Sequence, residues 1–262
     1  MATERDPREL GGAWTHHQRH SFVAPSSELA EVVQGFWTAE WDYDTPYEQK
    51  IVPLPHVHLT AFAGSAPTVV GVASRHVIRV LAGRGRVVGA IFHPGAFRSY
   101  LGAPVASITN RIFPATQIAA LPPFGEINDP TDLEKCLLAA LPEPDPLGAE
   151  ARYVVDLIRD DPALGRVDAL AAATGMSVRR LQRLFAEYIG ISPKWVLRRY
   201  RLHEITERLN AGTPIDWAGC AADLGYADQA HLSRDFTDLF GEPPTAYAQR
   251  YPTPSASDPL RK

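Results

Sequence analysis

The sequence contains few cysteines, no long apolar run and no excess of positive charge. Its two cysteines, Cys136 and Cys220, fall in separate predicted domains, which excludes a disulfide framework and a four-cysteine zinc site. No apolar stretch approaches the ~18 residues of a membrane-spanning helix. Residues 1–6 are polar and predict no signal peptide. We therefore expect a protein of the reducing cytoplasm with no membrane partner.

The overall charge does not indicate a polyanionic partner. The formal net charge is −4 at pH 7, so the chain as a whole does not attract nucleic acid. The basic residues are unevenly distributed, however: from Arg179 to Arg201 there are seven of them and one acid, Glu187. Because phosphate binding needs positive charge only at the docking face, local contact with nucleic acid stays open.

The common motifs of catalysis are also missing. There is no Gly-x-Ser-x-Gly nucleophile turn. The glycines of residues 83–86 lack the following Gly-Lys pair and helix of a phosphate-binding loop, and we predict a hairpin turn there. We therefore expect that the protein is not an enzyme and binds no cofactor.

Three histidines of the N-terminal half remain as candidates for a site. His56 and His58 fall on one predicted strand face, with His93 at the end of a nearby strand, as in metal-binding cupins. Residues 59–66 contain no carboxylate to complete such a site, so we expect no metal. The histidines either line a pocket for an organic ligand or are polar residues on the exposed face of a strand. The alternative function is a metal-dependent, cupin-like enzyme in this half with an appended helical module.

Residues 21 to about 115 show the two-residue period of β-strands. Trp37, Ala39, Trp41 and Tyr43 alternate with more polar residues, and further short strands are predicted over 57–63, 68–73, 76–81 and 86–92. Short strands at this spacing are typical of a compact β-sandwich or barrel. A helix is predicted over 131–141, followed by a proline-rich linker at 142–149 that should be stiff and semi-extended.

A repeated pattern organises the C-terminal third. Leu-x-Arg-x-Phe followed by Gly-x-x-Pro occurs at 181–193 and again, 51 residues later, at 232–244. Each copy predicts a helix, a tight turn and a second helix. Gly175 is suited to the first turn, and Ser177 and Asp228 are placed to cap the second helix of each unit.

The second helix of each unit has an apolar face and a polar face. Leu181, Leu184 and Phe185 share one side of the first, and its other side carries Arg and Gln. A lone helix of this kind is more often an ordinary amphipathic helix with a solvated charged face. Two copies at fixed spacing favour a pair of helices that read the DNA major groove, where Arg bonds guanine and Gln bonds adenine.

Residues 166–250 resemble the DNA-binding domain of the AraC/XylS family of bacterial transcription regulators. The residues that carry the resemblance are Leu170-Ala171, Gly175-Met176-Ser177, the two repeated patterns, Arg201-Leu202 and the run from Gly225 to Phe236. The resemblance implies two helix-turn-helix units joined by a long helix. Both recognition helices would enter successive major-groove segments, ~34 Å apart, on one face of the DNA.

The resemblance also assigns roles to residues by position. Bases would be contacted by the outward side chains of both helices: Arg179, Gln182, Arg183, Gln229, His231 and Arg234. Candidates for phosphate contacts are Ser177, Arg180, Arg198, Arg199 and Ser233, although the arginines after residue 193 are equally compatible with solvated charge. Ala230 falls where members of the family often have a polar residue, and Cys220 is expected to be a small buried hydrophobe.

We therefore predict an α+β fold with a β-rich, sandwich- or barrel-like N-terminal domain followed by an all-α domain. The predicted division is a flexible N-terminus at 1–20, a sensor or dimerisation domain at 21–141, the linker at 142–149, the DNA-binding domain at 150–251 and a disordered tail at 252–262. The N-terminal half contains Val52-Pro53-Leu54-Pro55, His58-Leu59, Gly83-Arg84-Gly85-Arg86 and the run from Phe92 to Arg98. Through these residues it resembles domains that precede the same module in actinobacterial-type regulators. We expect a cytoplasmic, bacterial transcription regulator that associates with the nucleoid when bound to promoter DNA. A small-molecule effector, RNA polymerase and a second copy of the chain are further candidate partners.

Overall fold

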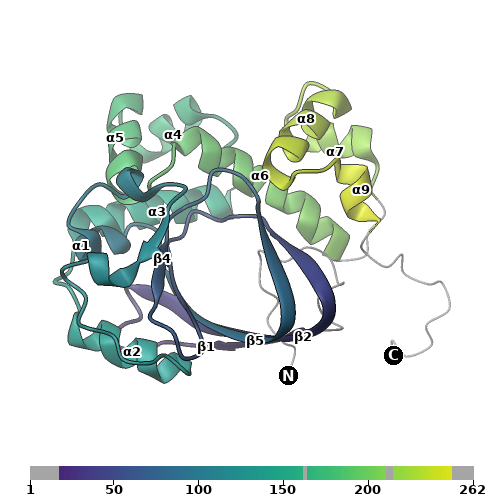
Figure 1. Cartoon of the computed structure of the whole chain (residues 1–262). Coiled ribbons are helices and arrows are strands. Elements are labelled where there is room, and N and C mark those ends of the chain that lie inside the picture. The colour runs from purple at the N-terminus through teal and green to yellow at the C-terminus, as the bar shows by residue number, and fades with distance from the viewer. Residues whose placement is uncertain (1–17, 162–163, 211–214, 250–262) are drawn as a thin grey trace, which may run out of the picture.

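A computed structural model describes residues 18–161, 164–210 and 215–249. It confirms the α+β class: an N-terminal domain built on an antiparallel sheet is followed by a helical domain (Figure 1). The predicted flexible N-terminus and tail lie outside the described residues, except for residues 18–20. These three were expected to be flexible, yet they begin the first strand, because Gln18 there is buried and its amide donates to the Tyr43 hydroxyl at 2.8 Å.

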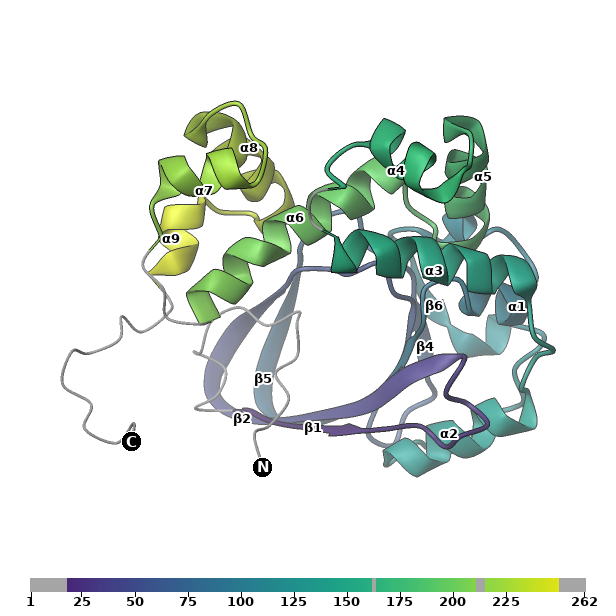
Figure 2. The ribbon, with the colours of Figure 1, turned by 180° about the vertical axis from the view of Figure 1, so that it is seen from behind.

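The strands form a single curved sheet and not two packed sheets. The sheet has the order β1-β2-β5-β3-β4-β6, and every neighbouring pair is antiparallel. The bounds are β1 Gln18–Val23, β2 Val33–Ile51, β3 His58–Phe62, β4 Thr68–Val70, β5 Val77–Phe92 and β6 Ile112–Pro114. The two longest strands, β2 and β5, extend beyond the rest of the sheet and curve toward the helical domain (Figures 1 and 2).

The predicted hairpin turn at residues 83–86 is wrong, because these residues lie inside the continuous strand β5. Gly85 pairs with Trp41 of β2, and a Cβ at Gly85 would lie 2.2 Å from Cζ2 of the Trp41 ring. Gly89 has the same relation to Trp37, at 2.4 Å from Cε2. These glycines therefore make room for indole rings that lie across the strand. Gly83, with φ +56°, lies where the register with β2 shifts.

One face of the sheet carries the N-terminal hydrophobic core. Phe36, Leu59, Val88, Ala90 and Phe92 are fully buried or nearly so and belong to one cluster. Short helices and turns cover this face: α1 Phe97–Leu101, η2 Val105–Ile108, η3 Ala115–Gln117 and α2 Pro130–Ala139. Helix α2 confirms the helix predicted over 131–141. It packs through Leu133 and Leu137, and Asp129 and Asp132 form a capping box at its start.

The helical domain begins earlier than the sequence indicated. Its elements are α3 Pro146–Asp160, α4 Val167–Thr174, α5 Val178–Tyr188, α6 Pro193–Asn210, α7 Trp217–Asp223, α8 Gln229–Phe240 and α9 Pro244–Ala248. The prediction of an extended linker through residue 149 is wrong for residues 146–149, because Asp145 caps α3 by accepting from the N–H groups of Leu147 and Gly148. Pro146 fits the first turn of a helix, where its missing N–H has no partner to lose.

The two domains pack against each other at several places. The Lys50 ammonium of β2 lies 2.7 Å from the Glu242 carboxylate, which follows α8, and both side chains are largely buried. Val52 is 1% exposed and belongs to the hydrophobic cluster of the second helical unit. The Trp195 indole of α6 donates to the Ser74 carbonyl at 2.8 Å. The N-terminal domain therefore contacts both the joining helix and the second unit.

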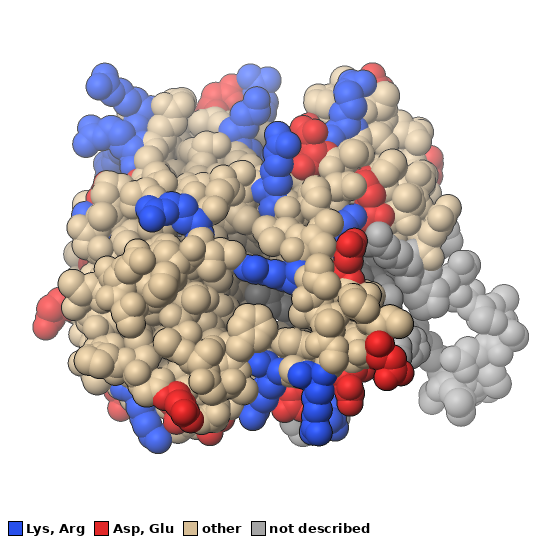
Figure 3. Space-filling model, in the orientation of Figure 1, with Lys and Arg blue, Asp and Glu red and all other residues tan. Residues whose placement is uncertain are grey.

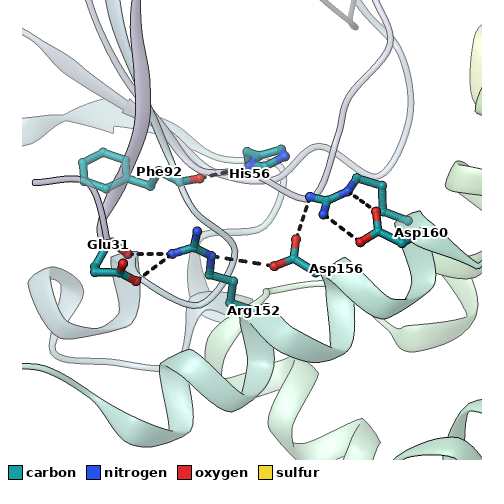
Figure 4. Close-up of polar contacts among 7 residues, drawn as sticks. Glu31, His56, Phe92, Arg152, Asp156 and Asp160 are labelled. Atoms are coloured by element: carbon teal, nitrogen blue, oxygen red, sulfur yellow. Dashed lines mark hydrogen bonds and ion pairs between the residues drawn. The ribbon is translucent and has the colours of Figure 1, made fainter. Parts of the chain in front are cut away.

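Helix α3 makes a further contact with the N-terminal domain. The Arg152 guanidinium lies 3.1 Å from a Glu31 carboxylate oxygen and 3.7 Å from the Asp156 carboxylate. Figure 4 draws both ion pairs. Asp156 also accepts from Arg159 at 2.6 Å. This chain of alternating charges lies along one side of α3, close to the segment that contains His56 (Figure 4).

Candidate nucleic-acid interface

The first helix-turn-helix unit has the predicted local structure. Gly175 has φ +66° and ends α4 in the left-handed conformation that a tight turn requires. The Ser177 side chain accepts from the N–H of Arg180 and caps α5. Leu181 and Phe185 are fully buried and hold α5 against the rest of the unit. The opposite face of α5 is consequently turned toward solvent.

The outward face of α5 carries the predicted base-reading side chains. Arg179, Gln182 and Arg183 are exposed, and they make no ion pair or side-chain hydrogen bond with any residue that the structure describes. Arg180 is also exposed, but its guanidinium lies 2.7 Å from the Glu150 carboxylate of α3. Three polar side chains on one helix face are thus available to an external partner, and a fourth is partly neutralised.

The second unit repeats this arrangement on α8. The Asp228 side chain accepts from the N–H of His231 at 2.6 Å and caps the helix. The buried face consists of Leu232, Phe236, Leu239 and Phe240, and the exposed face includes Gln229, Ala230, His231 and Arg234. Ser233 is half-buried. Cys220 lies in the core of this unit at 3% exposure, as predicted.

Helices α5 and α8 lie on the same side of the molecule. Figures 1 and 2 show both above the joining helix α6, one toward each of its ends. Figure 3 shows Lys and Arg side chains along this upper edge, over α4, α5 and α8, with some acidic side chains among them. Two helices with exposed faces of similar chemistry therefore lie on the same side of the molecule.

The prediction that Arg199 contacts phosphate is wrong. Its side chain on α6 is 1% exposed, and its Nε donates to the Pro53 carbonyl of the N-terminal domain at 2.7 Å. The guanidinium carbon lies 5.6 Å from the centre of the Phe240 ring. Burial lowers the pKa of Arg199 to about 10. No solvent-exposed phosphate can reach this group, which instead joins the two domains.

Arg198 is also committed within the protein. Its Nη2 donates to the Asp235 carbonyl of α8 at 2.7 Å, and the guanidinium forms ion pairs with the carboxylates of Asp235 and Asp238. With these contacts the predicted phosphate role does not fit Arg198. Arg201, one turn further along α6, bonds the Gly165 carbonyl and lies 5.2 Å from the centre of the Tyr226 ring. The sequence predicted no such structural role for either arginine.

His56, His58 and His93 of the N-terminal domain are not polar residues on an exposed strand face. His56 and His58 are 8% and 9% exposed, and Nδ1 of His56 lies 3.0 Å from the Phe92 carbonyl. His56 precedes β3, so only His58 belongs to a strand. Burial, together with the neighbouring Arg152, lowers the pKa of His93 to about 4. Within residues 18–161, 164–210 and 215–249, no three His, Cys, Asp or Glu side chains are grouped to hold a metal ion.

None of the helices in the described part of the chain is long and apolar enough to cross a membrane.

Comparisons with known proteins found one family match in each half of the chain. A family of helix-turn-helix domains matches residues 170–250, and a domain of unknown function (DUF6597) matches residues 21–114. A probable AraC family transcriptional regulator from Rhodopseudomonas palustris CGA009 shares 32% sequence identity. The match covers 38% of this chain and 94% of that chain, with a TM-score of 0.33.

Two further solved structures are similar to parts or all of the chain. An AraC-type transcriptional regulator from Chromobacterium violaceum has 23% identity and a TM-score of 0.35, covering 39% of this chain and 91% of its own. ToxT from Vibrio cholerae with a bound unsaturated fatty acid has 10% identity and a TM-score of 0.41, covering 95% of this chain and 100% of its own. At this level of similarity, the ToxT ligand says nothing about what this chain binds. The helix-turn-helix match and the 32% identical relative decide the assignment: the chain belongs to the AraC family and is a DNA-binding transcription regulator, not an enzyme.

Proposed function

We propose that α5 and α8 enter successive major-groove segments on one face of a promoter duplex. The observation that carries this proposal is that the two helices lie on the same side of the molecule and that both expose unpaired Arg and Gln side chains. In each helix the opposite face is buried, so its orientation is fixed by the core. A single chain would then grip two grooves, about one helical turn apart.

The side-chain chemistry suggests what each helix reads. An Arg guanidinium can bond guanine O6 and N7 together, and a Gln amide can do the same to adenine N6 and N7. We assign base contacts to Arg179, Gln182 and Arg183 in α5, and to Gln229, His231 and Arg234 in α8. Ser177, Arg180 and Ser233 are assigned to the phosphates that flank them. Because Ala230 offers no polar group, α8 should read fewer bases than α5.

We further propose that the N-terminal domain adjusts this grip in response to a small ligand or a partner. The support is the direct packing of residues 50–53 against α6 and the second unit. This segment leads into His56 and His58, which are buried in the N-terminal domain. Such an adjustment requires two arrangements of the domains that differ in DNA affinity. A ligand near these histidines could shift DNA affinity only by as much as its own affinity differs between these two arrangements.

Binding-site selection from random DNA tests the two-groove proposal. The wild-type protein should select a site with two conserved blocks, centred about one helical turn (~10 base pairs) apart. Arg183→Ala and Arg234→Ala should each lose about 1–3 kcal/mol of specific binding. Each should also relax the base preference in a different block.

The positions of the relaxed bases decide between outcomes. Arg166→Ala is the matched control, since Arg166 is an exposed arginine outside α5 and α8 that pairs with Asp168. It should leave the base preferences of both blocks intact. Relaxation by both variants in the same block, or wild-type affinity in both, would contradict the assignment of one groove to each helix.

A further inference from the structure

The joining helix α6 sends two arginines toward the second recognition helix and its turn. Arg198 and Arg201 are three residues apart and therefore lie on the same side of α6, about one turn apart. Arg198 reaches α8 itself. Arg201 reaches both the loop before α4, in the first unit, and the turn before α8, in the second.

Arg198 holds α8 by several contacts of different direction. Its Nη2 donates to the main-chain carbonyl of Asp235 at 2.7 Å, and the same nitrogen lies 3.3 Å from the Asp238 carboxylate. Its Nε lies 3.2 Å from the Asp235 carboxylate, as an ion pair and not as a directed hydrogen bond. Because the guanidinium is planar and its donors are fixed in direction, these contacts constrain how α8 is rotated as well as how far away it lies. Asp235 directly follows the predicted base reader Arg234.

Arg201 connects the two units through a ring. Its guanidinium bonds the Gly165 carbonyl just before α4, and it also stacks at 5.2 Å over Tyr226, which is 5% exposed in the turn before α8. The Tyr226 ring in turn meets the His231 ring edge-on, with 5.1 Å between centres. A continuous series of contacts therefore runs from the first unit to a predicted base reader of the second.

We infer that Arg198 and Arg201 are positioning residues that set the spacing between the two DNA half-sites accepted by the protein. They hold α8 at one rotation and distance relative to α5, and touch no base themselves. The inference rests on the proposed function, in which both helices contact DNA. Their half-buried position weakens screening by salt, so the contacts persist at physiological ionic strength.

The contacts of Arg198 and Arg201 should determine which spacing between the two half-sites the protein accepts. One added base pair moves the second half-site by ~3.4 Å along the duplex and rotates it by ~35°. A rigidly held α8 cannot follow that movement, whereas a released one can. The wild-type protein should therefore discriminate strongly against altered spacing, and the released variants should discriminate weakly.

The test measures binding of the full-length protein to three DNA probes. The first is the operator selected by the wild-type protein, the second carries one added base pair between the two blocks, and the third has the second block scrambled. Arg198→Ala and Arg201→Ala should each weaken binding to the first probe by about tenfold. The ratio of affinities between the first and second probes should fall toward one. Binding to the third probe should stay as in the wild type.

Arg208→Ala is the matched control on the same helix. Arg208 is as exposed as Arg198 and pairs with Glu204 and with Asp223 of α7, not with α8. We expect Arg208→Ala to leave the ratios of affinity between the three probes unchanged. A general loss of folded protein would weaken binding to all three probes equally, so it would not change these ratios either. Arg198→Lys should restore part of the spacing preference, because Lys keeps the positive charge. The restoration should be incomplete, because Lys lacks the planar guanidinium whose donors are fixed in direction.

Two results would overturn the inference, and they are distinguishable. If Arg198→Ala and Arg201→Ala retain the wild-type spacing ratio, these arginines do not position α8, while the two-groove proposal stands. If the wild-type protein binds the first and third probes equally, α8 does not read DNA. In that case the proposed function fails, and the inference fails with it.

Discussion

At the scale of single residues, the arginines of α6 show why exposure cannot be assigned from composition. Arg198, Arg199 and Arg201 lie within four positions of each other, and the sequence treats them alike. In the structure each faces a different neighbour: α8, the Pro53 carbonyl and the Gly165 carbonyl. A helix rotates by about 100° per residue, so adjacent arginines contact different parts of the molecule when a helix is packed on several sides.

His203 makes the stability of the protein depend on pH. Burial, and to a lesser degree the nearby Arg199, lower the pKa of His203 to about 3. The imidazole is therefore neutral in the folded protein at neutral pH, and its 3.5 Å contact with Glu207 is not an ion pair there. His93 behaves similarly, with a pKa of about 4. Both histidines have a pKa near 6.5 once the chain is unfolded.

The sign of the pH effect follows from these values. Below pH 6.5 the two histidines bind protons in the unfolded chain but not in the folded protein, which favours unfolding. Their full contribution to the free energy of unfolding is therefore present above pH 6.5. It is then lost on acidification toward pH 4 for His93 and pH 3 for His203. Each histidine should remove about 1.4 kcal/mol per pH unit in this window.

The variant His203→Gln should reduce this pH dependence. Between pH 6 and 4.5, the slope of unfolding free energy against pH, measured in urea, should fall by about 1 kcal/mol per unit. Unfolding at pH 7.5 is the internal control, since both states of the histidine are neutral there and only the packing change remains. An unchanged slope would show that His203 is protonated in the folded protein.

At the scale of elements, local signals predicted the helix-turn-helix units well. Gly175, Ser177 and Asp228 end or cap helices where the sequence placed them, because turn and cap geometry depends on a few adjacent residues. Strand β5 was divided wrongly because glycines usually interrupt strands. At Gly85 and Gly89 the absence of a side chain instead serves packing by Trp41 and Trp37, which lie on another strand.

Alanine at these two glycines should destabilise the sheet. Gly85→Ala and Gly89→Ala would place a methyl group within 2.2 and 2.4 Å of an indole ring atom, so the ring must move. We expect a loss of about 1–3 kcal/mol in the free energy of unfolding for each, together with altered tryptophan fluorescence. Gly125→Ala is the control, since a Cβ there meets no atom within 4 Å. Equal stability of all three variants would contradict the packing role.

At the scale of the whole molecule, the docking of the two domains was beyond the sequence analysis. Val52 completes the core of a unit more than a hundred residues away, and Lys50 pairs with Glu242. Nothing in the local pattern of residues 50–53 signals these partners, because contacts between domains depend on the arrangement of complete elements. The prediction that the N-terminal domain modulates DNA binding nevertheless has a physical route through these contacts.

A double-mutant cycle tests whether the domains fold as one unit at this contact. Lys50 and Glu242 are 17% and 13% exposed, so little solvent screens their attraction. The variants Lys50→Ala and Glu242→Ala, alone and combined, should yield a coupling energy of about 1–3 kcal/mol in urea unfolding. The matched cycle uses Arg152 and Glu31, whose carboxylate side is 90% exposed, and should yield about 0.5 kcal/mol or less. A coupling of Lys50 and Glu242 no larger than the one expected for the exposed pair would mean that this ion pair does not help to hold the second helix-turn-helix unit. The route for an effector signal would then depend on Val52 and on the contact between Arg199 and Pro53.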